Sequence, residues 1–275
     1  MSTLYLVATP IGNLEDISNR ALRILREARC IAAEDTRRTV KLLSHYDIHT
    51  PLISFHEHSQ KSKLTGLLAE LEMGNLALVS DAGTPLLNDP GAELVSAALE
   101  AGHQVCPIPG PSAPLAALIA SGLPAGAFLY LGYLPRISGE RQRLLGEIAS
   151  LPYTLIFLET PHRLLEALGD LERVLGDRPI AVARELTKIH EEILRGTISQ
   201  ARLHFNQQAP RGEFTLVVAG APSKQKEPWT IEELQAAVQE RISLDIPPAQ
   251  IASQLAIASG WPRRRIYRMI TELER

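Results

Sequence analysis

The sequence predicts an α/β protein with two α/β domains, a cleft between them, and a small helical domain at the carboxyl end. Short β-type apolar runs alternate with helix-type stretches over the first third of the 275 residues, which is typical of a parallel sheet covered by helices. A Gly- and Pro-rich segment at 121–127 and a polar segment at 223–228 then interrupt the chain. We therefore expect domains at 1–119, 120–222 and 223–275.

The first domain is expected to contain five strands. Apolar runs bounded by turn residues predict strands at 4–8, 30–33, 52–55, 76–80 and 104–108. Ile17, Ala21, Ile24 and Ala28 are spaced by four, three and four residues, so they share one face of a helix between the first two strands. This order of strand, helix and strand predicts largely parallel pairing.

The second domain is expected to contain a mixed sheet, and the third a set of helices. Runs at 128–134, 154–158, 180–183, 193–197 and 214–219 have fewer helices between the last three, which favours antiparallel neighbours. Helices are expected at 139–149 and 164–175, and then at 231–242, 248–259 and 263–273. Gly260 stands between the last two, so this segment also resembles a helix-turn-helix.

Composition narrows the classes of function. Lys and Arg number 28 and Asp and Glu 31, so the net charge is −3, which excludes a generally basic surface but not a local basic patch. The longest apolar run, at 113–123, is shorter than the roughly 18 residues that span a bilayer, so we expect a soluble chain and no membrane partner. Cys30 and Cys106 are expected to be reduced thiols, which predicts a cytoplasmic protein.

Turn-forming segments follow four of the five predicted strands of the first domain. TPIGN follows the first strand, EDTRR the second, SDAGTP the fourth and PGPSAP the fifth. Loops at the carboxyl ends of parallel strands line the ligand crevice, so these four loops are expected to converge on one site. Gly12, Gly83 and Gly110 would let the backbone approach a ligand closely.

The common phosphate-binding and hydrolytic motifs do not occur. The sequence has no GxxxxGK[ST], GxGxxG, CxxC, HExxH or GxSxG, so nucleoside triphosphate binding, dinucleotide binding and zinc hydrolysis lose their main support. Polar residues instead gather after strands, at Glu34 with Asp35, at Glu159, and at Glu185 with Lys188. Such density beside buried strands predicts a cleft, although salt-bridged surface turns would give the same pattern.

Eight segments, in order, resemble one family. TPIGNLEDIS, AAEDTR, SDAGTPLLNDPG, PIPGPSAP, GYLPR, LETPHR, ARELTKIHEE and RGEFTLVV are similar to segments of the bacterial 16S ribosomal RNA (cytidine 2′-O)-methyltransferase I family, in the tetrapyrrole methylase superfamily. The ribosomal branch is the closer match, because TPIGN stands where porphyrin-methylating members resemble a GPGD turn. Two departures are Ser112, where a Cys is often found, and Ile137, where a basic residue is common.

The resemblance implies two α/β domains of tetrapyrrole-methylase type with S-adenosylmethionine, the methyl donor, in the cleft between them. No metal is expected, because the departing thioether is neutral. The expected donor contacts are Pro10, Gly12, Asp81, Ala82, Gly83, Thr84, Ser112, Ala113, Leu158, Ala183 and Thr215. The implied reaction is methylation of a cytidine ribose 2′-hydroxyl. The implied partner is 16S ribosomal RNA or the small ribosomal subunit, and the implied oligomer is a homodimer.

A base that takes the hydroxyl proton could raise the rate by about 10²- to 10⁴-fold. The candidates are Glu34, Asp35, Glu159, Glu185 and Lys188, the last only if burial or a neighbouring cation lowers its pKa. RNA phosphates need basic partners, which are expected at Arg37, Arg38, Arg136, Arg263, Arg264 and Arg265. The sequence does not choose among the bases, and each arginine patch could equally be a solvated surface.

Two other functions stay open. A methylase of a small tetrapyrrole-like substrate would not need the arginine-bearing tail at 223–275. A non-catalytic helix-turn-helix regulator would bind duplex DNA without a methyl donor, and it would leave the strand-end loops without a role.

Overall fold

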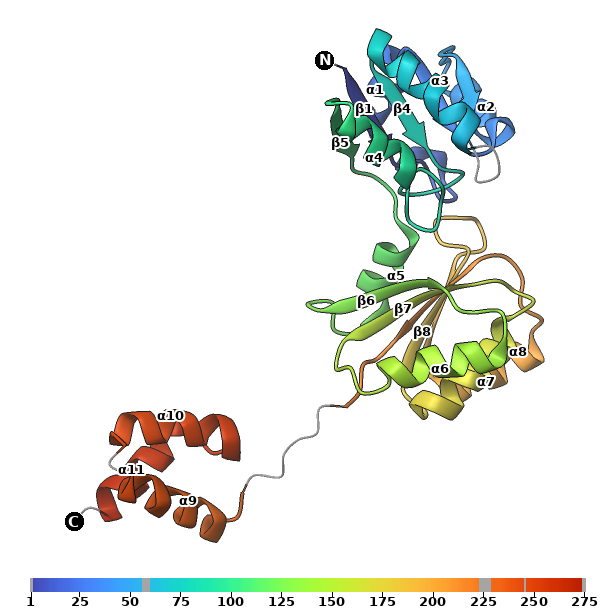
Figure 1. Cartoon of the computed structure of the whole chain (residues 1–275). Coiled ribbons are helices and arrows are strands. Elements are labelled where there is room, and N and C mark those ends of the chain that lie inside the picture. Colours follow the sequence, from blue (N-terminus) through green and yellow to red (C-terminus); the bar gives the residue numbers. More distant parts are fainter. Residues whose placement is uncertain (1, 56–59, 223–228, 245, 274–275) are drawn as a thin grey trace. The chain divides into compact units, whose positions relative to one another are not determined.

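The computed structural model describes residues 2–55, 60–222, 229–244 and 246–273. The chain forms two compact units, Met1–Ala221 and Pro222–Arg275. Figure 1 shows that the first unit contains two sheets with helices packed on them, and that the described part of the second contains helices alone. The predicted polar linker at 223–228 lies outside the described residues.

The first sheet is parallel throughout. Its strands are β1 (Thr3–Val7), β2 (Cys30–Ala33), β3 (Leu52–Ser54), β4 (Leu76–Val79) and β5 (Gln104–Ile108), in the order β3-β2-β4-β1-β5. All residues of β2 and β4 are buried, as expected of apolar strands covered on both faces. The five predicted strands and their parallel pairing are confirmed.

Helices cover both faces of this sheet. On one face lie α1 (Asn19–Glu27) and α2 (Thr36–His45), which follow the short 3₁₀ helix η1 (Leu14–Asp16), and on the other lie α3 (Gln60–Met73) and α4 (Ala92–Glu100). The hydroxyl of Ser18 caps α1 by accepting a hydrogen bond from the Ala21 amide. Ile17, Ala21, Ile24 and Ala28 are all buried, so the predicted apolar face of α1 is confirmed.

The second sheet is mixed, as predicted. Its strands are β6 (Phe128–Tyr133), β7 (Thr154–Glu159), β8 (Pro179–Arg184), β9 (Glu192–Thr197) and β10 (Phe214–Val218), in the order β6-β7-β10-β8-β9. Only β6 and β7 pair in parallel, and the other neighbours are antiparallel. One face packs against α6 (Ser138–Ile148), α7 (Leu164–Leu175) and α8 (Ile198–Gln207), and the other against α5 (Ala113–Ser121).

Helix α5 belongs to the packing of the second sheet. Its Ala117 and Leu118 lie in one apolar cluster with Ile156, Ala181 and Val217. The chain therefore passes to the second sheet before α5 begins, whereas the predicted boundary between residues 119 and 120 falls inside this helix. The division of residues 1–221 at that point stays a prediction.

An ion pair is buried between helices α6 and α7, which cover one face of the second sheet. Arg141 on α6 has an exposed fraction of 1%, and its Nε donates to the Asp170 carboxylate on α7 at 2.7 Å. Its Nη1 also donates to the carbonyls of Pro135 and Arg136 at 3.1 and 3.3 Å. Burial alone would raise the pKa of Asp170, but the hydrogen bonds from Ser138, Gln142 and Arg141 outweigh it and lower the pKa.

We expect Asp170→Ala to lower the free energy of unfolding by about 3–5 kcal/mol, because the buried Arg141 guanidinium would lose its nearest carboxylate and keep the exposed Glu166 carboxylate 3.9 Å away. The double variant Arg141→Met/Asp170→Leu should recover most of this loss, since it removes both charges. Chemical denaturation of the two variants measures the difference. An equal loss in both would show that the effect comes from packing and not from the stranded charge.

The second unit is a three-helix arrangement around its own core. Its helices are α9 (Ile231–Ser243), α10 (Pro248–Ser259) and α11 (Arg263–Leu273), which confirms the predicted patterns. Gly260 has φ +72° at the turn between α10 and α11, a conformation that favours glycine. Within the described part of the chain, no helix has the length and apolar character needed to cross a membrane.

Candidate active site

The loops at the carboxyl ends of β1, β2, β4 and β5 are tied to one another. Thr9 and Gly83 exchange two backbone hydrogen bonds, of 2.9 and 3.0 Å. The Asp35 amide donates to the Asp81 carboxylate at 2.9 Å, and the Thr84 hydroxyl donates to the Pro111 carbonyl at 3.1 Å. The four turn segments identified in the sequence therefore do converge at one edge of the sheet.

Three residues of the second sheet form a row that faces these loops. Thr215 on β10 is in register with Leu158 on β7 and with Ala183 on β8. Because side chains alternate between the two faces of a sheet, residues in register point to the same face. The row thus joins three residues that the resemblance had assigned to the donor pocket.

A cavity of about 210 Å³ lies between the loops of the first sheet and this row. Both parts of the first unit contribute to its wall. The lining residues are Ile11, Arg38, Asp81, Ala82, Leu87, Asn88, Asp89, Ala113, Tyr133, Leu158, Glu159, Ala183, Leu186, Glu213, Phe214 and Thr215. The predicted cleft between two α/β parts is thus present as a lined cavity, which we call the first cavity.

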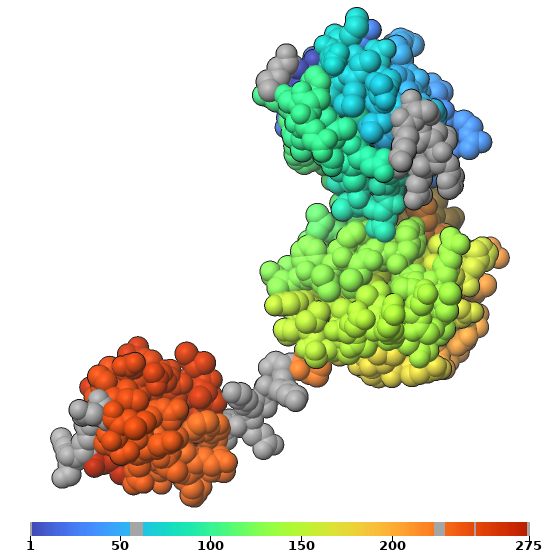
Figure 2. Space-filling view, in the orientation of Figure 1, coloured from blue at the N-terminus to red at the C-terminus, as the bar shows by residue number. Residues whose placement is uncertain are grey.

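The loop after β4 reaches across to the second sheet. Asn88 adopts φ +71°, and its side-chain oxygen accepts a hydrogen bond from the Tyr130 hydroxyl. Gly132, with φ +64°, lies so close to the Asn88 amide that a Cβ there would overlap it. The surface in Figure 2 shows this segment of the upper lobe resting on the lobe that contains β6. The contact fixes the neighbouring residue, Asp89, at the cavity wall.

The charges of the first cavity are mostly negative. Among the described residues, Asp81, Asp89, Glu159 and Glu213 line it together with one cation, Arg38, whose Nη1 lies 3.5 Å from an Asp81 carboxylate oxygen. Burial raises the pKa of Asp89 to about 6, and the negative charge of Asp81 adds to this increase. A hydrogen bond from Ser80 acts in the opposite direction but is outweighed. The cavity therefore suits a cationic ligand and holds a carboxylate that titrates near neutral pH.

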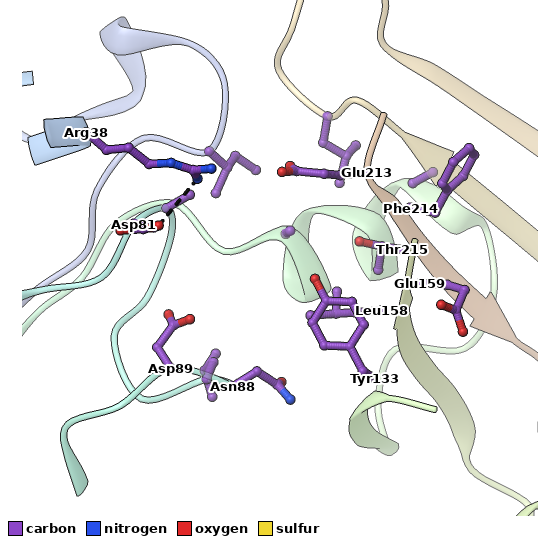
Figure 3. Close-up of a pocket in the computed structure, with 16 residues that line it drawn as sticks. Arg38, Asp81, Asn88, Asp89, Tyr133, Leu158, Glu159, Glu213, Phe214 and Thr215 are labelled. Carbon is purple, nitrogen blue, oxygen red and sulfur yellow. Dashed lines mark ion pairs between the residues drawn. The ribbon is translucent and has the colours of Figure 1, made fainter. Parts of the chain in front are cut away.

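Figure 3 shows how these side chains point. The Asp89 carboxylate and the Tyr133 hydroxyl extend toward the same open space, while the Glu159 carboxylate lies apart from them, beyond Tyr133. The Glu159 side chain is buried, and one of its oxygens accepts a hydrogen bond from the Thr160 amide at 2.8 Å. Burial raises the pKa of Glu159, while Thr160 and Arg163 act in the opposite direction.

Glu34 and Asp35 lie beside the first cavity without lining it. Asp35 caps α2 and binds the Arg37 guanidinium at 2.8 and 3.0 Å, and the hydrogen bonds from Arg37 lower the pKa of Asp35 to about 2. This carboxylate is a weak base. Burial and the charges of Asp89 and Asp81 raise the pKa of Glu34, which also accepts a hydrogen bond from the Asp81 backbone.

Glu185 and Lys188 pair with each other near the rim. Lys188 Nζ lies 2.9 Å from the Glu185 carboxylate and 3.1 Å from that of Glu213. Burial would lower the pKa of Lys188, but these two carboxylates outweigh burial and raise it. The lowered pKa that Lys188 would need as a base is therefore not found. Burial alone would raise the pKa of Glu185. The hydrogen bonds that it accepts from Lys188 and from the Glu213 amide outweigh burial, so the pKa is lowered.

The predicted donor contacts divide into lining and supporting residues. Asp81, Ala82, Ala113, Leu158, Ala183 and Thr215 line the first cavity. Pro10 lines an adjoining cavity, and Gly12 lines a third together with Glu185 and Lys188. Gly83 and Thr84 join the loops together. Ser112 precedes α5, and its buried hydroxyl has no hydrogen-bond partner among the described residues.

The predicted RNA-binding arginines belong to several different elements. Arg38 lines the first cavity, whereas the guanidinium of Arg37 is engaged by Asp35. Arg136 is exposed in the loop after β6. Arg263, Arg264 and Arg265 are exposed on α11 in the second unit, where the Arg265 guanidinium stacks 4.4 Å from the centre of the Trp261 ring.

Eight lining residues were absent from the predicted site: Ile11, Leu87, Asn88, Asp89, Tyr133, Leu186, Glu213 and Phe214. The signal for two of them is the turn-forming Asn-Asp-Pro-Gly sequence at 88–91, which follows a strand like the other loops. Leu86 and Asn88 both have positive φ, which marks this loop as constrained. All eight residues also stand within the segments quoted for the family resemblance.

The charge of the first cavity fits S-adenosylmethionine. The donor has a sulfonium, an ammonium and a carboxylate, so its net charge of about +1 complements the acidic wall. Ala113, the first residue of α5, lines the cavity, and helix amino termini favour carboxylates. Gly83 has φ +84°, and a Cβ there would lie 3.2 Å from a methyl group of Ile11, so a larger residue at this position would crowd Ile11, which lines the cavity.

Comparison with known proteins places the chain in a family. The family described as tetrapyrrole (corrin/porphyrin) methylases matches residues 3–202. Ribosomal RNA small subunit methyltransferase I of Synechocystis sp. is 47% identical over 100% of this chain and 99% of that protein. The protein of the same name from Halalkalibacterium halodurans is 48% identical over 96% of this chain and 93% of that protein.

A solved structure agrees in fold. Uroporphyrin-III C-methyltransferase from Thermus thermophilus, complexed with S-adenyl homocysteine, has a TM-score of 0.54 at 21% identity, and the match covers 78% of this chain and 97% of that chain. The fold, the family match and the near full-length relatives agree with the resemblance found in the sequence. The chain therefore belongs to the tetrapyrrole methylase family and, within it, to the ribosomal RNA small subunit methyltransferase I proteins.

Proposed function

We propose that this chain methylates the ribose 2′-hydroxyl of a cytidine in the 16S ribosomal RNA of the small ribosomal subunit, with S-adenosylmethionine as methyl donor. The observation that carries the proposal is the acidic cavity between the two sheets, in a chain that is 47% identical to ribosomal RNA small subunit methyltransferase I of Synechocystis sp.. The carboxylates of its wall can bind a cationic methyl donor, and one of them can accept the proton of the hydroxyl.

The donor would be held by both parts of the first unit. Asp81 and the neighbouring loop would bind its polar groups, and the row of Leu158, Ala183 and Thr215 would close the pocket on the other side. S-adenosylmethionine supplies an electrophilic methyl group on a sulfonium. The chain supplies alignment, which can account for about 7 kcal/mol or more of the barrier in well-oriented reactions.

We propose Asp89 as the acceptor of the hydroxyl proton. Its carboxylate faces the open space of the first cavity, and Ser80 and the Asn88–Tyr130 contact hold it in place. A base is most effective when its pKa lies near the working pH, and Asp89 meets this condition better than Asp35. Burial also raises the pKa of Tyr133, so its hydroxyl remains a hydrogen-bond donor in the same space.

The proposed function is tested on ribosomal RNA from cells that lack the protein. Mass spectrometry should show the loss of one ribose methyl on a cytidine of 16S ribosomal RNA, and the purified protein with S-adenosylmethionine should restore it. Unmethylated naked RNA and unmethylated small subunits are offered separately to identify the true substrate. An unchanged methylation pattern would contradict the proposal, and methylation of a porphyrin precursor instead would favour the small-substrate alternative.

The second unit is proposed to bind RNA phosphates through α11. We expect the triple variant Arg263→Ala, Arg264→Ala and Arg265→Ala to weaken RNA binding and to reduce the slope of log affinity against log salt by about one for each phosphate that is no longer bound. Binding titrations at several salt concentrations measure both quantities. The triple Arg→Lys variant is the control that keeps the charge. If the alanine variant binds like the wild type, α11 has a structural or protein-binding role.

We further propose that the protein acts in the cytoplasm as a homodimer, as the resemblance implies. Analytical ultracentrifugation tests the oligomer, and a single species at the 30.2 kDa mass of the chain would contradict it.

A further inference from the structure

A second cavity, of about 190 Å³, adjoins the first. Its wall comes from the loop after β1, from one side of α2, and from the end of β4. The lining residues are Thr9, Pro10, Leu14, Arg38, Thr39, Lys41, Leu42, Ser80 and Asp81. Arg38 and Asp81 also line the first cavity, so their ion pair, visible at the left of Figure 3, stands where the two cavities meet.

The two cavities differ in charge. Counting the part of the chain that the structure describes, four carboxylates and one guanidinium line the first cavity, whereas the second is lined by Arg38, Lys41 and the carboxylate of Asp81. That carboxylate is already engaged, because it accepts the Asp35 amide hydrogen bond and pairs with Arg38. Lys41 is exposed and makes no ion pair within residues 2–55, 60–222, 229–244 and 246–273. The second cavity therefore suits an anion.

Resting on the proposed function, we infer that the second cavity binds the phosphate of the acceptor nucleotide, with Arg38 and Lys41 as its ligands. Arg38 has several N–H donors and touches Asp81 through one nitrogen, so it can bind a phosphate oxygen while the pair stays in place. Lys41 lies three positions further along α2, on the same side of the helix, and adds a point charge.

This placement explains how the acceptor would meet the donor. In a ribonucleotide the 2′-hydroxyl is adjacent to the 3′-phosphate on the same sugar. A phosphate held by Arg38 and Lys41 puts that sugar at the junction of the two cavities, beside Asp81. Asp89 is linked to the same junction through Ser80, which lines the second cavity. An anionic acceptor and a cationic donor thus occupy neighbouring compartments of opposite charge.

The test compares Lys41→Ala and Arg38→Ala with Arg23→Ala. Arg23 is an exposed arginine on α1 that pairs with Glu27, so its removal changes the net charge equally without touching either cavity. We expect Lys41→Ala to weaken binding of unmethylated 16S ribosomal RNA about tenfold, as for the loss of one charged hydrogen bond, and to leave S-adenosylmethionine affinity unchanged. The KM for small subunits should rise while kcat changes little. Lys41→Arg should restore both values.

Three results would overturn the inference. RNA binding by Lys41→Ala equal to that of the wild type would show that the second cavity does not hold a phosphate. An equal loss in Arg23→Ala would show that only overall charge matters. A loss of donor affinity in Lys41→Ala would assign the cavity to the donor. Absence of methyl transfer by the wild type would instead defeat the proposed function, while the RNA-binding measurements would still decide the role of this cavity.

Discussion

Replacing Asp89 with asparagine is expected to lower kcat by about 10²- to 10⁴-fold, the usual contribution of a general base. The rate of the wild type should rise with pH through about 6, where Asp89 loses its proton, and Asp89→Asn should abolish this rise. Steady-state kinetics between pH 5 and 8 measure both effects. Glu159→Gln is the comparison, because burial raises the pKa of that carboxyl as well. If Glu159→Gln removes the pH dependence and Asp89→Asn does not, the proton acceptor is Glu159.

The same substitution is expected to stabilise the protein above pH 6. Burial raises the pKa of Asp89 from 3.8 to about 6, so the folded state binds its proton more tightly than the unfolded state does. Stability is therefore lost as the pH rises from about 4 to 6, and asparagine avoids that loss. Allowing for partial exposure to solvent, we expect a gain of about 1–2 kcal/mol at pH 8 that disappears toward pH 4. A residue with only a structural role would destabilise the fold when replaced.

Asp81→Ala is expected to abolish binding of S-adenosylmethionine while leaving the fold intact. Asp81 lines both cavities, accepts the Asp35 amide hydrogen bond and pairs with Arg38. Its replacement therefore removes a negative charge and also removes two contacts that connect the loops. A hydrogen bond to a charged group contributes about 1.5–3 kcal/mol, so the loss of two such bonds between the donor and the Asp81 carboxylate would weaken donor binding by at least a hundredfold.

Isothermal titration calorimetry measures the donor affinity of this variant, and circular dichroism checks its fold. Asp81→Asn is the matched control, because it keeps the oxygen that accepts the Asp35 amide hydrogen bond but removes the charge. Its affinity should lie between those of the wild type and Asp81→Ala. Undiminished affinity in Asp81→Ala would remove the first cavity from consideration as the donor site.

Much of the fold could be predicted because its signals are local. Each strand of the first sheet is a short apolar run with turn residues at both ends, and the four loops that line the site follow such runs directly. The family and its methyltransferase activity were also predicted, since eight segments occur in the same order. Local patterns therefore place both the sheets and the sheet edge whose loops line the first cavity.

What the sequence could not show depends on contacts between distant segments. Arg141 stands in a charged stretch typical of a surface helix, yet it is buried because Asp170 on another helix faces it. The pKa of Asp89 depends on burial that only the folded loop creates. Helix α5 packs on the second sheet because its apolar face fits against Ile156, Ala181 and Val217. The sequence of the helix alone does not show which sheet this face will contact.

The contact between Asn88 and Gly132 has a consequence for how this protein can evolve. The Asn88 side chain occupies the space that Gly132 leaves empty, and the two residues come from the loop after β4 and from strand β6. A larger residue at position 132 is disfavoured twice, because the positive φ there strains any L side chain and because Asn88 fills the space that its Cβ would need. We therefore expect Gly132 to tolerate substitution only when the backbone at that position and the loop that carries Asn88 both move.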